Sequence, residues 1–341
     1  MGFIENIKID DNVYSVLLRL LKNKTGINFE FYRKNFIEKR IKSRLIRIPC
    51  KNLEDYYDYL FSHEEEIKKF SDGFTINYTH FFRDWEVYKT FQDLFLACLN
   101  KKPEEFTQFI KPSFTKLEKF RSEDNYKKNQ AKKKNSNKEL DPFALNVLTI
   151  LSPLSIFRKI KAPQTSNNKI NIWSAPCASG EEPYTIAMIL DNLEHMIHNF
   201  PNYRIIASDI DKDAIIKAKS GIYEEMTMKE IPEYFKNKYF KKKETHFGFK
   251  YSINEEIKNN VEFIDEDLTK GCLKPFKYDI VFCRYLLIYF NRNNRDKFLK
   301  NIENQLNIGG LLILGKTETL FNNHPVLRLV DEKNHIYIKS Y

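Results

Sequence analysis

The sequence predicts an α/β protein in which a small all-helical N-terminal domain precedes a doubly wound, mainly parallel sheet. The first observation is that apolar residues within 11–70 recur at helical spacing. The second is that short apolar runs alternate with helical segments from residue 170 onward, as in parallel sheets with right-handed crossovers. The third is that the charged segment 222–258 interrupts this alternation, which predicts a small inserted β-subdomain.

The individual elements follow from the same periodicities. Asp72-Gly73 predicts a break after four N-terminal helices, which we expect at 13–21, 31–48, 53–61 and 64–70. A fifth, amphipathic helix is expected at 85–99. Residues 247–252 alternate like an edge strand of a hairpin. The main strands are expected near 170–174, 204–208, 261–264, 278–283 and 311–315.

Composition limits the class of protein. The chain of 341 residues is long enough for two domains. It has no apolar run of about 18 residues, so we expect no membrane insertion, and residues 1–8 lack a signal-peptide pattern. The five cysteines are dispersed without a C-x-x-C pair, which predicts a cytoplasmic protein without a disulfide or a metal site. They are Cys50, Cys98, Cys177, Cys272 and Cys283.

The formal net charge of +10 is concentrated in one segment. Residues 101–169 contain 16 Lys and Arg against 7 Asp and Glu, a net of +9. The rest of the chain is therefore nearly neutral, which weakens a nucleic-acid-binding interpretation. We expect four parts, of which the third is partly flexible. They are a helical domain at 1–74, a linker and helix closing the site at 75–100, a lysine-rich insert at 101–165, and an α/β domain at 166–341 with its inserted subdomain at about 225–260.

A strand, a loop of small residues and a helix start occupy residues 169–190, and such a unit binds ligands in open α/β sheets. The loop lacks the G-x-G-x-x-G pattern of dinucleotide sites. Glu181 and Glu182 open the helix, where they would repel a phosphate. A cationic ligand without phosphate fits better, and S-adenosylmethionine carries a sulfonium and an ammonium group. The alternative is that both glutamates only cap the helix.

Further polar residues follow later strands of the predicted sheet. Asp209 ends the second strand and suits a ribose diol, whereas Asp211 is better placed to start the next helix. Helix capping is the alternative for both aspartates. Asp267 and Leu268 follow the third strand, where they suit the amine and the face of an adenine.

The strand at 278–283 is followed directly by Arg284 and Tyr285, and Tyr289 comes one turn later. Catalytic groups in such sheets lie beyond the carboxyl ends of the strands, so these side chains are candidates for the site. The alternative for Tyr289 is a buried aromatic helix face.

Several segments match one family as a set. They are Asn77-Tyr-Thr-His-Phe-Phe-Arg83, the loop and helix start at 172–184, Ala207-Ser-Asp-Ile-Asp211 with 220–223, the segment 282–290, and 309–315. Together they resemble the CheR-type chemotaxis receptor methyltransferases. The matches span roughly residues 15–340 in the right order, apart from the insert, and their joint occurrence is specific although no single segment is.

The resemblance implies an S-adenosylmethionine-dependent protein-glutamate O-methyltransferase, which releases S-adenosylhomocysteine and methylates glutamates in the cytoplasmic domain of a chemoreceptor. It also implies a linker motif that closes over the cofactor. Arg83 and Tyr289 would flank the transferred methyl group as catalytic residues, and the choice between Glu181 and Glu182 stays open. The implied cofactor-binding residues are Asn77, Thr79, Arg83, Glu181, Glu182, Asp209, Asp267, Leu268, Arg284 and Tyr285.

The chain departs from the family pattern at two places. Tyr285 stands where the family usually has Asn. Because a phenol ring cannot reproduce the paired donor and acceptor of an amide, we expect a backbone contact or an altered contact there. The insert at 101–165 is longer than the family leads us to expect, and it falls between the linker helix and the first strand, away from the pocket.

Methyl transfer to a carboxylate requires alignment and desolvation more than it requires a base. A glutamate with a pKa of about 4.3 is already ionised at neutral pH, and no histidine obviously serves as a base. Arg83 suits the acceptor because a guanidinium holds a carboxylate in a fixed plane, and the Tyr289 hydroxyl could orient one oxygen. The alternative for Arg83 is a salt bridge to Asp84 or Glu86.

The predicted helix at 31–48 is strongly basic, with Glu38 as its single acid. Receptor methylation sites lie on glutamate-rich helices, so this helix suits receptor recognition. The alternatives are a solvated surface helix and a calmodulin-like or membrane-surface helix. The residues to which we assign recognition are Arg33, Lys39, Arg40, Arg44 and Arg47.

Two other functions compete with receptor methylation. The first is a nucleic-acid methyltransferase that uses the basic insert. Pro176-Cys177 resembles the Pro-Cys nucleophile of cytosine methylases, but it lies in the cofactor loop rather than in a substrate loop. The second is a non-catalytic adaptor that binds S-adenosylmethionine or its product. Fold alone cannot separate these functions. We favour the receptor methyltransferase, acting as a monomer without a nucleic-acid partner.

Overall fold

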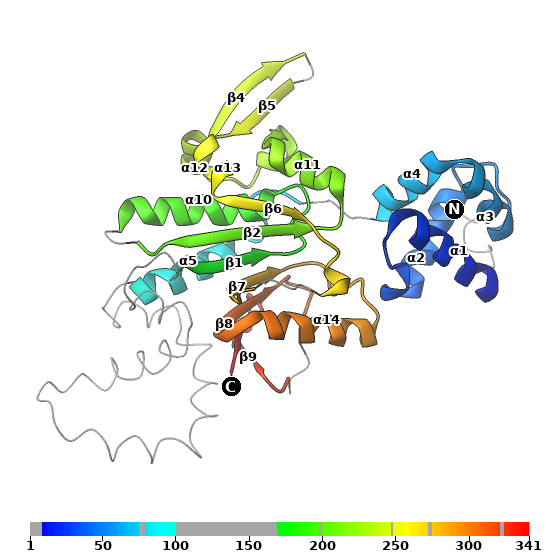
Figure 1. Ribbon diagram of the computed structural model, residues 1–341. Helices are drawn as coiled ribbons and strands as arrows, with labels where there is room; N and C mark the ends of the chain where they lie inside the picture. Colours follow the sequence, from blue (N-terminus) through cyan, green and yellow to red (C-terminus); the bar gives the residue numbers. More distant parts are fainter. Residues whose placement is uncertain are drawn as a thin grey trace, which may run out of the picture.

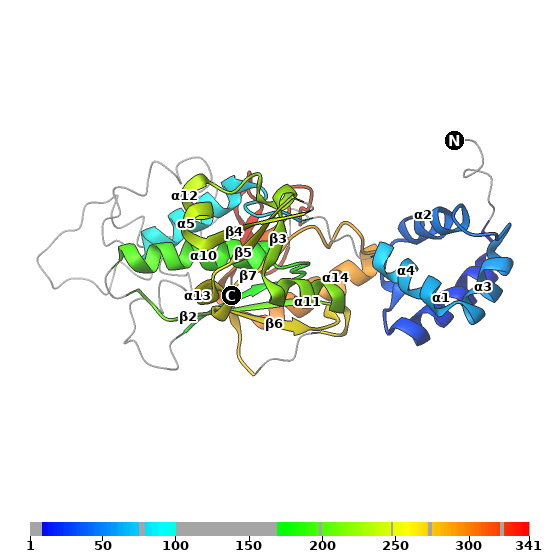
Figure 2. The ribbon, with the colours of Figure 1, turned by 90° about the horizontal axis from the view of Figure 1, so that it is seen from above.

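The computed structural model describes residues 9–74, 79–99, 169–197, 200–246, 248–271, 275–320 and 324–340. These residues form a helical domain and an α/β domain. Figure 1 shows the helical domain (blue) beyond one end of the sheet, and Figure 2 shows the same arrangement from above. The predicted insert at 101–165 and the predicted cofactor-binding residue Asn77 lie outside the described residues.

The N-terminal domain is all-helical, as predicted. Its elements are α1 (Asp11–Thr25), η1 (Phe29–Phe31), α2 (Lys34–Leu45), α3 (Leu53–Ser62) and α4 (Glu64–Phe74). The Asp10 carboxylate caps α1, and Gly26 ends that helix in the left-handed conformation at φ 77°. Buried aliphatic and aromatic side chains from all four helices form one core.

Several predicted helix boundaries in this domain are wrong. The first helix is longer than the predicted 13–21, and the second is Lys34–Leu45 and not 31–48. The second helix starts late because Phe29–Phe31 form η1 and Tyr32 forms a β-bridge with Phe290 of the α/β domain. The fourth helix continues through Asp72-Gly73, because the buried Phe70 keeps its last turn attached to the core. Gly in a last helical turn lowers helix propensity without ending the helix.

Arg44 and Glu66 form an ion pair inside the helical domain. Arg44 Nε donates to Glu66 Oε1 at 2.7 Å, and its NH2 group donates to Oε2 at 2.6 Å. The Tyr56 hydroxyl donates to the same carboxylate at 3.1 Å. Because the Glu66 side chain is only 3% exposed, this bidentate pair stabilises the packing of α2 on α4, and breaking it would leave a buried charge.

The α/β domain contains a seven-stranded sheet with the order β6-β2-β1-β7-β8-β10-β9. Five strands are parallel, at β1 (Ile170–Ser174), β2 (Tyr203–Asp209), β6 (Val261–Asp265), β7 (Tyr278–Cys283) and β8 (Leu306–Leu314). The strand order reverses at β1 and β7, and ligands bind at such a reversal. The predicted doubly wound sheet is therefore confirmed, although β8 begins earlier than the predicted residue 311.

Two strands at the sheet edge were not predicted. They are β9 (Leu327–Asp331) and β10 (Ile336–Lys339), which pair antiparallel with each other, and β10 pairs antiparallel with β8. Both are short, and the alternation of apolar and polar residues in 327–331 is broken at Val330, which follows the apolar Leu329 directly.

Helices cover both faces of the main sheet. Alternate strand residues such as Ile172 and Phe282 pack with α5 (Trp85–Leu99), α10 (Glu181–Met196) and α11 (Lys212–Ser220). The intervening residues, such as Trp173 and Val281, pack with α14 (Arg292–Gln305) on the other face. The period of two along each strand thus divides the core into two layers.

A small antiparallel sheet is inserted between β2 and β6, as predicted. It contains β3 (Ile222–Glu224), β4 (Phe240–Thr245) and β5 (Gly248–Ile253) in the order β3-β5-β4, and Figure 1 shows the β4–β5 hairpin projecting from the domain. The strand predicted at 247–252 is present as β5, but its predicted edge position is wrong, because β5 is central and pairs with β3 as well as with β4. Short elements flank this sheet in the sequence, at η4 (Glu225–Met228), α12 (Glu233–Tyr239) and α13 (Glu255–Asn259), and η5 (Leu268–Lys270) follows β6 of the main sheet.

Among the described residues, no helix is both long enough and apolar enough to cross a membrane. The same residues contain no group of three or more His, Cys, Asp or Glu side chains arranged to hold a metal ion.

Candidate functional site

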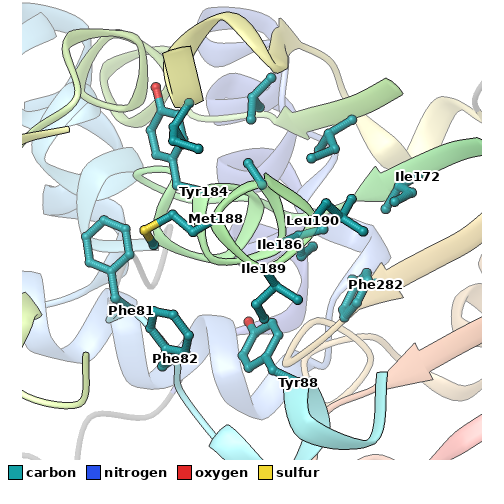
Figure 3. Close-up of a cluster of buried hydrophobic side chains, with 14 of the residues drawn as sticks. Phe81, Phe82, Tyr88, Ile172, Tyr184, Ile186, Met188, Ile189, Leu190 and Phe282 are labelled. Carbon is teal, nitrogen blue, oxygen red and sulfur yellow. The ribbon is translucent and has the colours of Figure 1, made fainter. Parts of the chain in front are cut away.

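The linker that carries Arg83 is fixed to the α/β domain by buried aromatic residues. Phe81 and Phe82 are both fully buried, and Figure 3 shows them with Tyr88 of α5 beside Met188 and Ile189 of α10. The Phe82 N–H donates to Thr185 Oγ1 at 3.2 Å. The linker backbone therefore has a defined path along the first turns of α10.

Arg284 connects this linker to the rest of the site. The guanidinium is buried at the carboxyl end of β7. Its NH1 group donates to Glu182 Oε2 at 3.2 Å and to the Tyr88 hydroxyl at 3.0 Å. Its NH2 group donates to the Arg83 carbonyl at 3.0 Å and to the Asp84 carboxylate. One side chain thus binds α10, α5 and the linker at once.

Arg83 lies against the ring of Tyr285. The Arg83 Cζ atom is 3.7 Å from the ring centroid, and the Tyr285 hydroxyl donates to Asp84. The two acids considered as salt-bridge partners of Arg83 pair with other residues. Asp84 pairs with Arg284 and Lys316. Glu86 likewise pairs with Lys333 at 3.4 Å.

The two glutamates at the start of α10 have different environments. Glu182 lines the hollow beside Arg83, accepts from Ser174 Oγ at 2.8 Å and pairs with Arg284. Glu181 is fully buried and accepts from Ser179 Oγ at 2.8 and 2.9 Å. Burial raises the pKa of Glu181 to about 7. Glu182 is therefore the glutamate that can reach a ligand in the hollow.

Asp209 stands at the end of β2 and organises two loops. Its Oδ2 atom accepts from the Ala178 N–H at 2.8 Å, and its Oδ1 atom accepts from the Asp211 N–H at 3.0 Å. Burial raises the pKa of Asp209 to about 6, although these two N–H groups oppose the shift. Asp211 caps α11 through the Ala214 N–H, as its position in the sequence suggested. Asp209 remains the candidate for the ribose.

Asp267 and Leu268 lie across the cleft from the helical domain. Asp267 Oδ1 accepts from the Thr269 N–H at 2.9 Å, which caps η5. Its Oδ2 atom is buried and has no hydrogen-bond partner within the described part of the chain, although Lys270 Nζ is 3.4 Å away. An acceptor of this kind fits the exocyclic amine of an adenine, so the residues present fit the predicted cofactor.

Two adjoining hollows form one cleft at the carboxyl ends of the strands, and both are lined by Pro176, Ala178 and Tyr285. The first is also lined by Thr79, His80, Arg83, Tyr88, Cys177, Glu182 and Arg284. The second is also lined by Tyr32, Phe36, Asp209, Ile210, Asp267, Leu268, Thr269, Leu286, Tyr289 and Phe290. A third hollow between α4 and α11 carries charges of both signs and shares only Ile210 with this cleft.

Tyr289 lies where the two domains meet. Its ring centroid is 4.8 Å from that of Phe36 in α2, and its carbonyl accepts from the Arg33 N–H at 2.8 Å. Burial raises the pKa of the Tyr289 hydroxyl, although Arg40 and Arg83 oppose the shift through their charges. The charges of two guanidiniums, one from α2 and one from the linker, therefore act on this phenol.

The predicted recognition residues divide into four environments. Lys39 and Arg47 are exposed, and Arg40 lies over the Phe36 ring at 5.5 Å. Arg33 Nε donates to the Phe290 carbonyl at 3.0 Å, which attaches α2 to the α/β domain. Arg44 is bound by Glu66 inside the helical domain. Receptor recognition stays a prediction, and Arg44 could serve it only by breaking a buried ion pair.

Sequence reasoning missed two residues that shape this site, Glu318 and His80. Glu318 is buried and accepts from the backbone N–H groups of Tyr285 and Leu287 at 2.6 and 2.7 Å. His80 lines the cleft and pairs with Glu230 at 3.0 Å. Glu318 follows the end of β8 by four residues, so the reasoning that found Asp209 and Asp267 could have found it as well.

The comparison with known families agrees with this geometry. The CheR methyltransferase all-alpha domain matches residues 12–75, and the CheR methyltransferase SAM binding domain matches residues 149–336. The chain belongs to the CheR methyltransferase family. The second match begins within the segment that was predicted as an insert at 101–165.

Curated relatives cover nearly the whole chain. A chemotaxis protein methyltransferase of Borreliella burgdorferi is 29% identical over 324 residues, which are 93% of this chain and 92% of that protein. Chemotaxis protein methyltransferase 2 of Vibrio cholerae is 27% identical over 322 residues, covering 93% of this chain and 88% of that protein. The chain is thus an S-adenosylmethionine-dependent methyltransferase of the chemotaxis type, and the predicted cofactor is confirmed.

Solved structures are much more distant. A structure of PKMT2 from Rickettsia typhi with AdoHcy shares 15% identity and covers 43% of this chain and 20% of that chain, at a TM-score of 0.27. Similarity at that level carries no argument about this chain.

Asp209 offers a direct test of the cofactor site. We expect Asp209→Ala to weaken binding of S-adenosylhomocysteine by about 1.5–3 kcal/mol, the scale for losing hydrogen bonds to a charged group. Calorimetry would measure the affinity, and thermal unfolding would check that the variant folds. Asp265→Ala is the matched control, since Asp265 ends the neighbouring strand β6 with a 42% exposed side chain. Equal affinities for the parent and the folded Asp209→Ala variant would remove Asp209 from the site.

Glu181 predicts a pH dependence of stability. Its folded pKa of about 7 exceeds the unfolded value of about 4.3, so the folded state binds more protons between these values. The free energy of unfolding therefore falls as the pH rises through this window. We expect Glu181→Gln to be more stable than the parent by about 1–3 kcal/mol at pH 8 and nearly equal at pH 4. Denaturant titrations at both pH values would measure this.

The exposed residue Glu65 provides the control for that experiment. Glu65→Gln should change the free energy of unfolding by similar small amounts at both pH values. A Glu181→Gln variant that is no more stable than the parent at pH 8 would contradict the assigned pKa.

Proposed function

We propose that the chain transfers the methyl group of S-adenosylmethionine to glutamate side chains in the cytoplasmic helices of a chemoreceptor. The observation that carries this proposal is the Arg83 guanidinium, held by stacking in a cleft that is also lined by the carboxylates of Glu182, Asp209 and Asp267. A guanidinium fork suits an acidic acceptor. Methyl transfer to a nitrogen or carbon atom of a nucleic-acid base offers no carboxylate for this fork to orient.

The acids of the cleft would bind the cofactor. Asp209 would accept from the ribose hydroxyls, and Asp267 with Leu268 would contact the adenine. Glu182 would face the cationic part of the cofactor, next to Arg284. When bound, S-adenosylmethionine supplies a methyl group on positively charged sulfur, which a carboxylate oxygen can take in a single displacement.

The residues of this chain then contribute alignment and desolvation. A substrate glutamate is ionised at neutral pH, so no group has to remove its proton. Arg83 would bind the carboxylate edge-on and fix its plane, and the Tyr289 hydroxyl would donate to one oxygen. The aromatic residues Tyr32, Phe36 and Phe290 around Tyr289 exclude water, which strengthens these contacts.

A labelling experiment tests the function. The protein would be incubated with methyl-labelled S-adenosylmethionine and a receptor cytoplasmic fragment, and the label would be followed through alkaline hydrolysis. Base-labile label on the receptor supports a glutamate methyl ester. Stable label on RNA or DNA would support the nucleic-acid methyltransferase instead. Cofactor binding without transfer to any of these would support the adaptor.

A substitution at Arg83 distinguishes an effect on methyl transfer from an effect on cofactor binding. Arg83→Lys keeps the charge but loses the planar fork, so we expect kcat to fall by about tenfold or more while the affinity for S-adenosylhomocysteine changes by less than about threefold. Steady-state kinetics and calorimetry would measure the two quantities. Arg19→Lys, at an exposed position of α1, is the matched control. Full activity of Arg83→Lys would refute the orienting role of the guanidinium.

The exposed basic residues of α2 and its end test receptor recognition. We expect the double reversal Lys39→Glu with Arg47→Glu to raise KM for the receptor fragment several-fold at low salt, and less at high salt, because screening weakens the charge contacts. Cofactor affinity should not change. Reversal of exposed Arg19 and Lys22 on α1 alters the net charge equally and is the control. Equal KM values for the two double variants would identify α2 as an ordinary solvated surface.

A further inference from the structure

We propose that Tyr285 is a positioning residue for Arg83, and that its ring sets the plane in which the guanidinium receives the substrate carboxylate. The inference rests on the proposed function, because it concerns how Arg83 meets an acidic acceptor. The distance of 3.7 Å between Arg83 Cζ and the Tyr285 ring centroid is a stacking distance. Stacking uses a face of the guanidinium, whereas a carboxylate binds at its edge, so both contacts can exist together.

The Tyr285 ring is fixed at its outer end by Asp84. The phenol hydroxyl donates to the Asp84 carboxylate, which also binds Arg284 and lies 3.4 Å from Lys316 Nζ. Burial opposes the effect, but the Tyr285 hydroxyl and Arg284 hold the pKa of Asp84 below its ordinary value. Asp84 therefore stays ionised near neutral pH and keeps the ring in place.

The backbone of Tyr285 is fixed at the inner end by Glu318. Tyr285 has φ 61°, in the left-handed region that aromatic residues rarely adopt. Its N–H donates to Glu318 Oε2 at 2.6 Å, and the same carboxylate accepts from the N–H groups of Leu287 and Gly315 at 2.7 and 2.8 Å. This buried carboxylate stabilises the strained turn that aims the ring at Arg83.

Gly315 shows how closely the loop after β8 fits this arrangement. A Cβ atom at Gly315 would lie 2.8 Å from Glu318 Oε2 and 3.1 Å from Tyr285 Cδ1. Only glycine leaves room for both the carboxylate and the ring. The Tyr285 ring, which belongs to the turn after β7, thus packs against the linker and against the loop after β8.

The strain at Tyr285 indicates a function and not only a packing choice. Asn adopts the left-handed conformation more readily than Tyr, so Asn at position 285 would relieve the backbone. An amide is too short and too small to cover the Arg83 guanidinium as the ring does. Tyr at position 285 costs stability, and the stacking of its ring on the Arg83 guanidinium therefore explains why it stands there.

Three substitutions at position 285 test this inference. Tyr285→Asn relaxes the backbone, so we expect unchanged or higher thermal stability together with a kcat lower by about tenfold or more. Tyr285→Leu should lower kcat similarly, whereas Tyr285→Phe keeps the ring and should retain more of kcat than either. Because Tyr285 also lines the hollow assigned to the cofactor, kcat is measured at saturating S-adenosylmethionine, so that a change in cofactor affinity does not enter it. Tyr234→Leu, at an exposed tyrosine of α12, is the control for loss of a tyrosine.

A double-mutant cycle with Arg83→Lys shows whether Tyr285 acts through Arg83. In the Arg83→Lys background the fork is already lost, so we expect Tyr285→Asn to cause little further loss of kcat. Multiplied losses in the double variant, an active Tyr285→Asn variant, or equal losses for Phe and Asn would each overturn the inference.

A measurement without turnover separates this inference from the proposed function. Phenylglyoxal modification of Arg83, followed by peptide mass spectrometry, should be several-fold faster in Tyr285→Asn than in the parent because the covering ring is gone. Equal rates would overturn the inference. A parent enzyme that methylates no receptor fragment would refute the proposed function, and the modification rates would still decide the role of the ring.

Discussion

The site depends on the buried guanidinium of Arg284. This one group binds the Glu182 carboxylate of α10, the Tyr88 hydroxyl of α5, and both the Arg83 carbonyl and the Asp84 carboxylate of the linker. A buried arginine is costly unless several partners satisfy its N–H groups. The network therefore fixes the linker at Arg83 and Asp84, because Arg284 binds the Arg83 carbonyl and the Asp84 carboxylate.

Backbone strain is concentrated in the linker around Arg83 and in the lining of the cleft. Among the described residues, five that are not glycine have a positive φ. They are Phe82, Asp84, Ala178, Tyr285 and His335. Phe82 and Asp84 are the two neighbours of Arg83, and Ala178 and Tyr285 line the cleft with it. Each such residue costs on the order of 1 kcal/mol or more and persists only where its surroundings determine it. The buried aromatic packing of Phe82 and the hydrogen bonds of Asp84 supply that determination.

The sequence was sufficient for features that depend on local patterns. Asp209 and Asp267 could be predicted because a polar residue after an apolar strand occupies a known edge of a parallel sheet. Arg44 could not be distinguished from its basic neighbours, because its partner Glu66 belongs to another helix. The stacking of Arg83 on Tyr285 was equally inaccessible, since it depends on a left-handed turn that Glu318 stabilises from a third segment. The resemblance to a family identified Tyr285 as a departure from the usual Asn. It did not show which residue the Tyr285 ring contacts.

Carboxylates and guanidiniums both line the cleft, and this has a consequence for the proposed reaction. Glu182 lines the same hollow as Arg83 and pairs with Arg284, whereas Asp209 and Asp267 line the hollow that also contains Tyr289. A cationic donor would be attracted to these carboxylates and an anionic acceptor to Arg83, and both would lose water on entering the cleft. Charge would then bring donor and acceptor into one cleft, but alignment along the line of transfer would still depend on the contacts that hold the Arg83 guanidinium, above all its stacking on Tyr285.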